Sequence, residues 1–176
     1  MVLLELFEKL DNTTTEQKRV FDVIIDAVNN STGGFYFVYG YGRIGKTYMD
    51  KALSVAIRSS WEIVLNIASS GIASLLLPNR CMAHSMFKIP LDLNEDSICY
   101  IKQGTPLAKL VCKAKPIVWD RAPMLNKLCY ETLDKSLRDI LRFEPYYNVD
   151  LPFGKKVVVL GGDFRQIFPV IPIGSR

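Results

Sequence analysis

The fold of this chain is indicated most clearly by residues 35–47, FYFVYGYGRIGKT. Residues 35–40 form an apolar run without alternation, which is typical of a strand buried on both faces. A glycine-rich turn follows, and residues 47–57 have helical character. A strand, a tight turn and a helix in this order predict an α/β domain with a largely parallel sheet.

Residues 40–47, GYGRIGKT, fit two nucleotide-binding patterns. The first six residues satisfy the dinucleotide pattern G-x-G-x-x-G, and the whole octapeptide satisfies the phosphate-binding pattern G-x-x-x-x-G-K-[ST]. The dinucleotide pattern also needs an acid at the end of the second strand, about 20 residues on, to hold a ribose. Glu62 begins that strand instead, and its far end offers Asn66. The dinucleotide interpretation therefore fails at its second requirement.

The phosphate-binding interpretation meets its later requirements. Backbone N–H groups of such a loop and of the following helix can surround a phosphate chain. Lys46 can reach the terminal phosphates, and the Thr47 hydroxyl can ligate Mg²⁺. A second Mg²⁺-linked acid is expected at the end of another buried strand, where Asp120 ends the run KPIVWD. The loop residues that would bind the nucleotide are Gly40, Tyr41, Gly42, Arg43, Ile44 and Gly45, followed by Lys46 and Thr47.

Other segments complete an alternating α/β pattern. Thr13 or Thr14, followed three residues later by Glu16 or Gln17, predicts a capping box and a helix that closes at residues 29–34. Strands are predicted at 62–68, 115–120 and 155–163, and helices at 69–77 and 124–141. Residues 91–104 are polar and predict a loop.

Composition narrows the functional class. The 176 residues are 49% hydrophobic and 23% charged, which is ordinary for one globular domain. No apolar run approaches the ~20 residues of a membrane span. A net charge of +4 is too mild to argue for a polyanionic partner, and the four cysteines contain no C-x-x-C pair that would indicate zinc. Residues 1–13 are expected to be a short amphipathic extension and not a signal peptide.

Five segments, in this order, resemble the petite-integration-frequency family of 5′-to-3′ DNA helicases, and most closely its branch of Helitron-type transposon relatives. They are GYGRIGKT (40–47), ASSGIASLLL (68–77), AHSMFKIP (83–90), IVWDRAPM (117–124) and VVVLGGDFRQIFPVIPIGSR (157–176). The resemblance covers residues 14–176 and implies the first RecA-like P-loop motor domain of a helicase. It further implies ATP as substrate with Mg²⁺, single-stranded DNA as partner, and roles in DNA repair, recombination and telomere maintenance in the nucleus or the mitochondrion.

The resemblance implies roles for single residues at the nucleotide. Gln17 matches the glutamine that reads adenine, and Lys46 matches the phosphate-binding lysine. Thr47 and Asp120 match the Mg²⁺ pair. Gln166 matches the glutamine that couples the terminal phosphate to DNA.

Two further segments match DNA contacts of the family. Ser69, Ser70 and Gly71 resemble the segment that grips the DNA backbone, where hydroxyls and N–H groups at a helix start suit phosphate oxygens. His84 and Phe87 lie in a second DNA-contact motif, and an exposed Phe suits base stacking. Taken without the resemblance, the same two residues would be a helix-cap residue and a core aromatic.

The chain departs from the family at three points. The family has glycine and threonine where this loop has Arg43 and Ile44, and it has a water-polarising glutamate where this chain has Arg121. An arginine cannot accept a proton, but it could attract phosphates or pair with Asp120. The second motor domain of the family is expected to be absent, because the sequence stops at Arg176.

Three functions follow as alternatives. The chain is an ATP-dependent DNA helicase motor domain, or a catalytically impaired nucleotide- and DNA-binding remnant of one, or another P-loop phosphotransferase. The third is disfavoured because residues 91–104 contain none of the arginines that a kinase lid carries.

Overall fold

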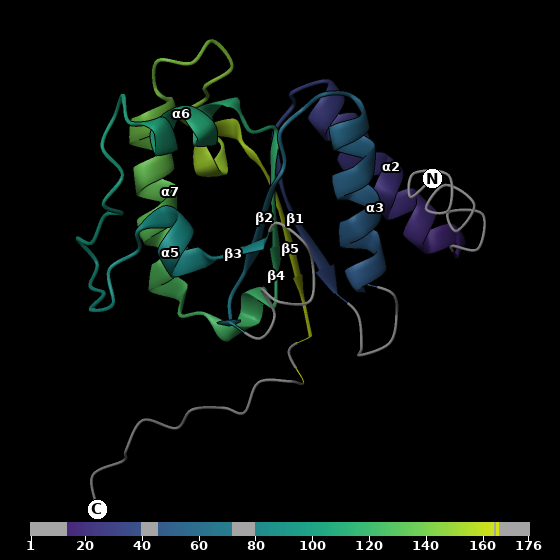
Figure 1. The fold of residues 1–176 in the computed structure, drawn as a ribbon, viewed down its shortest axis with the longest axis horizontal. Helices are drawn as coiled ribbons and strands as arrows, with labels where there is room; N and C mark the ends of the chain where they lie inside the picture. Colours follow the sequence, from purple (N-terminus) through teal and green to yellow (C-terminus); the bar gives the residue numbers. More distant parts are fainter. Residues whose placement is uncertain (1–13, 40–45, 72–79, 164, 166–176) are drawn as a thin grey trace, which may run out of the picture.

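The computed structural model describes residues 14–39, 46–71, 80–163 and 165. Its centre is a five-stranded sheet in the order β1-β5-β4-β2-β3, in which all neighbouring strands are parallel (Figure 1). The strands are β1 (Gly34–Tyr39), β2 (Leu65–Ala68), β3 (Arg80–Met82), β4 (Pro116–Asp120) and β5 (Val157–Gly162). The predicted α/β class with a mostly parallel sheet is confirmed.

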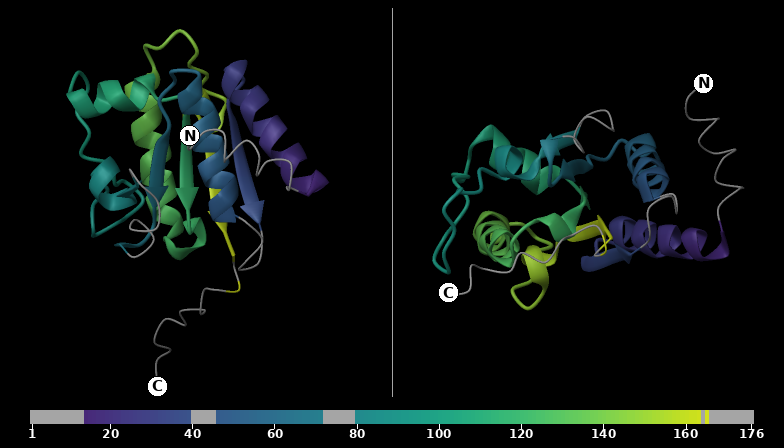
Figure 2. Two further views of the ribbon diagram at one scale, coloured as in Figure 1. Left: turned by 45° about the vertical axis from the view of Figure 1, so that its right-hand side comes forward. Right: turned by 90° about the horizontal axis from the view of Figure 1, so that it is seen from below.

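Helices cover both faces of the sheet (Figures 1 and 2). α2 (Thr15–Asn29) and α3 (Lys46–Ser59) pack on one face, and α5 (Ala83–Phe87), α6 (Pro106–Lys113) and α7 (Lys127–Leu141) pack on the other. Successive residues of β4 point to opposite faces, so that Val118 joins the core under α2 and α3, whereas Ile117 and Trp119 join the core under α5 to α7. Covering on both sides explains why the sequence of β4 is a continuous apolar run.

β1 is less buried than its sequence predicts. Its residues alternate between half-buried and exposed, and Phe35, Phe37 and Tyr39 stay 38–48% exposed. The reason is its place in the sheet, because β1 pairs with β5 alone among the described strands and so lies at an edge. Phe153, in the 3₁₀ turn η2 (Pro152–Lys155), stacks on Phe35 with 5.4 Å between ring centroids. The prediction of a fully buried strand here was wrong, although the strand itself is present.

The predicted helix starts are confirmed in part. The capping box forms between Thr14 and Gln17, with each side chain accepting a hydrogen bond from the backbone N–H of the other residue at 3.3 and 3.1 Å. The helix expected from residue 124 starts at Lys127 instead, capped by the side chain of Asn126. Ala122–Met124 form a separate 3₁₀ turn, η1. Residues 91–104 contain neither helix nor strand, as predicted.

No helix in the described part of the chain is long and apolar enough to cross a membrane.

Candidate functional site

The carboxyl ends of β1, β5 and β4 meet at one edge of the sheet. The pairing register places Tyr39 beside Gly162 and Trp119 beside Leu160, so the residues that follow these strands lie together. α3 begins at the same edge with Lys46 and Thr47, and Thr47 is exposed. No acidic residue occupies the first turn of α3, so the partial positive charge of its N-terminus is not offset within that turn. Such a helix start favours an anion.

Asp120 is the buried acid at this edge. It ends β4 with 8% of its surface exposed, and its Oδ1 accepts a hydrogen bond from the backbone N–H of Arg121 at 2.9 Å. Gly161 of β5 lies alongside, where a Cβ atom would stand 3.9 Å from Oδ1 of Asp120. The absence of a side chain at residue 161 therefore leaves space beside the carboxylate.

A second acid, Asp163, follows β5 at the same edge. It is 8% exposed, and its Oδ1 accepts from the backbone N–H of Arg165 at 3.0 Å. The sequence contained a signal for this position, because Asp163 follows the buried run of β5 just as Asp120 closes the run of β4. The candidate site therefore holds an acid that sequence reasoning did not assign.

The set of groups near Asp120 fits a magnesium ion carried by a substrate. Mg²⁺ usually binds through one or two carboxylates together with substrate phosphates and water. Asp120 and the Thr47 hydroxyl would supply the protein oxygens. Within the described residues no cluster of three or more His, Cys, Asp or Glu side chains is arranged to hold a metal without such a substrate.

Arg121 adopts a left-handed conformation with φ 54° and ψ 35°. Among the described residues, no ion pair joins its guanidinium to Asp120 or to another carboxylate. The turn that it begins is held from two sides. Tyr130 of α7 donates its hydroxyl to the carbonyl of Ala122 at 2.5 Å, and Pro123 packs against Gly162.

Several predicted nucleotide contacts lie outside the described residues. These are Gly40, Tyr41, Gly42, Arg43, Ile44, Gly45 and Gln166. Gln17 is described and is half-buried, and its side chain completes the capping box of α2. The first turns of α2 and α3 lie toward the end of the molecule where β1 and β5 finish (Figures 1 and 2).

The predicted DNA-contact residues are divided between the surface and the core. Gly71 is exposed, Ser70 and His84 are half-buried, and Phe87 is completely buried. The ring of Phe87 packs on Trp119 with 5.8 Å between centroids. The expectation of an exposed Phe87 for base stacking is therefore corrected, because α5 turns this side chain into the core.

Ser69 is bonded within the domain. Its backbone N–H and its hydroxyl both donate to the carbonyl of Asp120, at 3.2 and 3.4 Å. The hydroxyl oxygen also accepts from Nε1 of Trp119 at 3.0 Å. The segment predicted to grip DNA is thus joined directly to the residue predicted to bind Mg²⁺.

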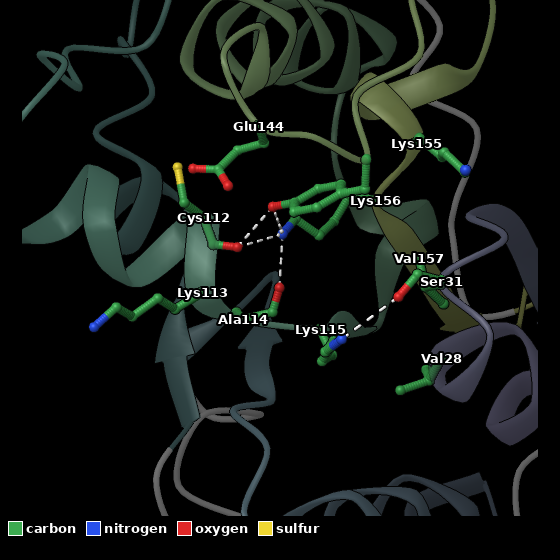
Figure 3. Close-up of a pocket in the computed structure, with 11 residues that line it drawn as sticks. Val28, Ser31, Cys112, Lys113, Ala114, Lys115, Glu144, Lys155, Lys156 and Val157 are labelled. Carbon is green, nitrogen blue, oxygen red and sulfur yellow. Dashed lines mark hydrogen bonds between the residues drawn. The ribbon is translucent and has the colours of Figure 1, made fainter.

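A cavity of about 320 Å³ lies at the opposite end of the strands, where β4 and β5 begin (Figure 3). Lys156 lies on its wall and is 3% exposed. Its ammonium donates to the carbonyls of Cys112 and Ala114 and to the hydroxyl of Tyr146, at 3.0, 2.6 and 3.2 Å. All three ammonium N–H bonds therefore have partners inside the domain. Lys156 is bonded as a structural group and has no donor left for a ligand.

The chain was compared with known families and with curated proteins. The family model described as PIF1-like helicase matches residues 5–176. A curated relative, the ATP-dependent DNA helicase PIF4 of Trypanosoma brucei brucei (strain 927/4 GUTat10.1), is 29% identical over 158 residues. That match covers 86% of this chain and 18% of the relative.

Solved structures show the same fold. A structure of Pif1 helicase from Bacteroides in complex with ADP-AlF3 and single-stranded DNA superposes with a TM-score of 0.71 at 26% identity, covering 91% of this chain and 34% of that one. A structure of two coordinating Pif1 helicases at forked double-stranded DNA also gives 0.71, at 25% identity, covering 91% of this chain and 35% of that one. The chain thus spans about a third of the length of these solved relatives.

Proposed function

The chain belongs to the PIF1-like helicase family, and from this premise we propose that it is a motor domain that couples Mg²⁺-ATP to the binding of single-stranded DNA. The proposed family role is that of a 5′-to-3′ DNA helicase of the Helitron-like branch, acting in DNA repair, recombination and telomere maintenance in the nucleus or the mitochondrion. The reported relatives are all helicases, which speaks against a small-molecule phosphotransferase.

The observation that carries the proposal is the position of Asp120. A buried carboxylate ends a central parallel strand at the sheet edge where α3 begins with Lys46 and Thr47. Ligands of open α/β sheets bind outside the carboxyl ends of the strands. In this arrangement the backbone at the start of α3 and Lys46 would bind the phosphates, and Thr47 with Asp120 would hold Mg²⁺. The ion would neutralise phosphate charge and orient the terminal phosphate.

The proposed DNA contacts begin next to this site. Ser70 and Gly71 follow β2, which pairs directly with β4. Hydroxyl and backbone N–H groups are suitable donors to DNA phosphates. His84, on the neighbouring helix α5, is half-buried and is the second proposed contact. Of the solved relatives, one contains single-stranded DNA together with ADP-AlF3, which supports placing both ligands on this domain.

A second candidate function is nucleotide and DNA binding without efficient turnover. The observation that favours it is Arg121, which follows Asp120 at the position proposed for the water-polarising acid. A guanidinium stays protonated and cannot take a proton from water. Loss of a general base typically lowers a rate by ~10²–10⁴. This candidate shares both binding sites with the first and differs from it only in the rate of hydrolysis.

The two binding functions are tested with the whole chain. Fluorescence anisotropy of a labelled oligothymidylate measures DNA binding, with the same sequence as a duplex for comparison. A fluorescent ATP analogue in the presence of Mg²⁺ measures nucleotide binding. The proposal expects both ligands to bind, with the single strand bound more tightly than the duplex. Failure to bind nucleotide, or equal affinity for single strand and duplex, would contradict it.

A further inference from the structure

Trp119 links three parts of the candidate site. It lies on β4 immediately before Asp120, and its side chain is completely buried. One neighbour of its ring is Phe87 of α5, and the other is Tyr130 of α7, with 5.1 Å between centroids. A buried indole N–H needs an acceptor. That acceptor is the Ser69 hydroxyl, so Trp119 holds in place the first residue of the proposed DNA-binding segment.

The donors of Ser69 are both used by Asp120. A serine has one backbone N–H and one hydroxyl hydrogen to donate. In the structure both are directed at the Asp120 carbonyl, at 3.2 and 3.4 Å. A DNA phosphate that accepted hydrogen bonds from Ser69 would therefore have to take them from Asp120. The residue has two alternative bonding arrangements, and they exclude one another.

The rest of the surroundings hold Asp120 in the first arrangement. The β2–β4 pairing ends with Ala68 beside Asp120, directly before Ser69. On the other side, the backbone N–H of Arg121 donates to Oδ1 of the same aspartate. A carboxylate held in this way is placed for a metal ion, whereas release of its carbonyl removes two of the bonds that fix its main chain.

We propose that Ser69 is a positioning residue which, held by Trp119, makes nucleotide binding at Asp120 and DNA binding at the 69–71 segment compete. This rests on the proposed function and adds its regulation. Mg²⁺-nucleotide favours the arrangement in which Ser69 donates to Asp120, and single-stranded DNA favours the arrangement in which Ser69 donates to phosphate. Since coupling between two sites is reciprocal, each ligand weakens the other by the same factor.

The test measures the affinity for labelled oligothymidylate with and without Mg²⁺ and a non-hydrolysable ATP analogue. In the parent protein the dissociation constant for DNA is expected to rise about fivefold or more when nucleotide is bound, which is the lower range of such couplings. Ser69→Ala removes one of the two shared donors and should reduce this factor at least twofold. Ser69→Thr keeps the hydroxyl and should retain the factor.

Ser59→Ala is the matched control, because it removes an exposed hydroxyl that donates to Ala56 at 2.7 Å within α3. It should leave the factor unchanged. A merely structural role of Ser69 would alter both affinities or the stability without altering their ratio. If the parent shows no coupling, or a coupling of opposite sign, or if Ser69→Ala keeps the full factor, the inference is wrong.

Trp119 supplies a second readout. The chain has two tryptophans, of which Trp61 is 96% exposed and Trp119 is fully buried. In a Trp61→Phe background, DNA is expected to change the emission of Trp119, because its N–H partner changes environment, and Ser69→Ala should abolish that change. Absence of an emission change in a protein that binds DNA would overturn the inference but leave the proposed function standing. A protein that binds neither ligand would overturn both.

Discussion

Pro123 lies so close to Gly162 that a Cβ atom on residue 162 would stand 2.2 Å from its Cδ. This contact joins the turn after Asp120 to the end of β5. It explains why the second glycine of the GGD sequence is required by the space available and not by its backbone conformation. The turn that carries Arg121 can rest against the neighbouring strand only while residue 162 has no side chain.

Gly162→Ala is therefore expected to destabilise the domain by about 1–3 kcal/mol, the usual range for an overpacked core position. Gly161→Ala is the matched control, because the nearest atom to its added Cβ lies at 3.8 Å, an ordinary contact. Urea denaturation of the two variants measures the difference. Equal stability of the two variants would show that the turn moves away from residue 162 without cost.

Much of this architecture could be predicted from local patterns. The apolar runs before Asp120 and Asp163 identified two central strands, since a strand covered on both faces needs no polar alternation. The Thr14–Gln17 capping box was also predictable, because both partners lie within one helical turn.

Features that depend on the sheet order could not be predicted in the same way. Phe35 and Phe37 form part of an apolar run as continuous as that of β4, but β1 lies at an edge, and the sequence of β1 alone does not contain its neighbours. The burial of Phe87 depends on how the short helix α5 packs on Trp119. The bonds between Ser69 and Asp120 join residues 51 positions apart and follow from the β2–β4 register.

Lys156 is expected to make stability depend on alkaline pH. Burial lowers the pKa of Lys156 from 10.5 to about 8, the nearby Lys115 acts in the same direction, and Cys112 and Glu144 oppose it. Between pH 8 and 10.5 the unfolded chain keeps a proton that the folded chain has released. Stability from this group therefore rises with pH in that window, and its cost is constant below pH 8.

The measurement is the difference in unfolding free energy between the parent and Lys156→Met from pH 7 to 10. The parent should gain on the variant above pH 8, with a slope of at most about 1.4 kcal/mol per pH unit for one proton. Ionisation of Cys99, whose pKa burial raises to about 11, acts in the opposite direction in both proteins and cancels in the difference. A difference that stays constant with pH would contradict the buried position of the ammonium.

Gln17 has two assigned roles that mutation can separate. Thr14→Ala removes a cap of α2 and should cost about 1 kcal/mol of stability without changing nucleotide preference. Gln17→Ala also disturbs the cap, and in addition it should reduce the preference for ATP over GTP, since an amide side chain can pair with adenine. Competition binding with the two nucleotides distinguishes these effects. An unchanged preference would leave Gln17 as a capping residue alone.

Arg121→Glu is expected to raise the basal rate of ATP hydrolysis by placing a carboxylate beside Asp120. The exchange is a fair comparison, because neither residue is glycine and both bear the cost of the left-handed backbone at this position. A tenfold gain corresponds to about 1.4 kcal/mol of barrier. Arg121→Gln, which has no proton acceptor of comparable strength, should stay near the parent rate. Equal rates for the Glu and Gln variants would place the water-handling group elsewhere.

Calorimetric titration of Mg²⁺-ATP tests the central claim most directly, because it measures binding at the sheet edge without requiring hydrolysis. The parent chain should bind with a measurable heat that weakens when Mg²⁺ is removed. Lys46→Ala and Asp120→Asn should each weaken binding at least tenfold, the first through lost phosphate contact and the second through lost metal coordination. Lys51→Ala, which removes an exposed lysine on α3 five residues after Lys46, should bind like the parent. Equal heats from the parent, Lys46→Ala and Asp120→Asn would contradict a nucleotide site at this edge.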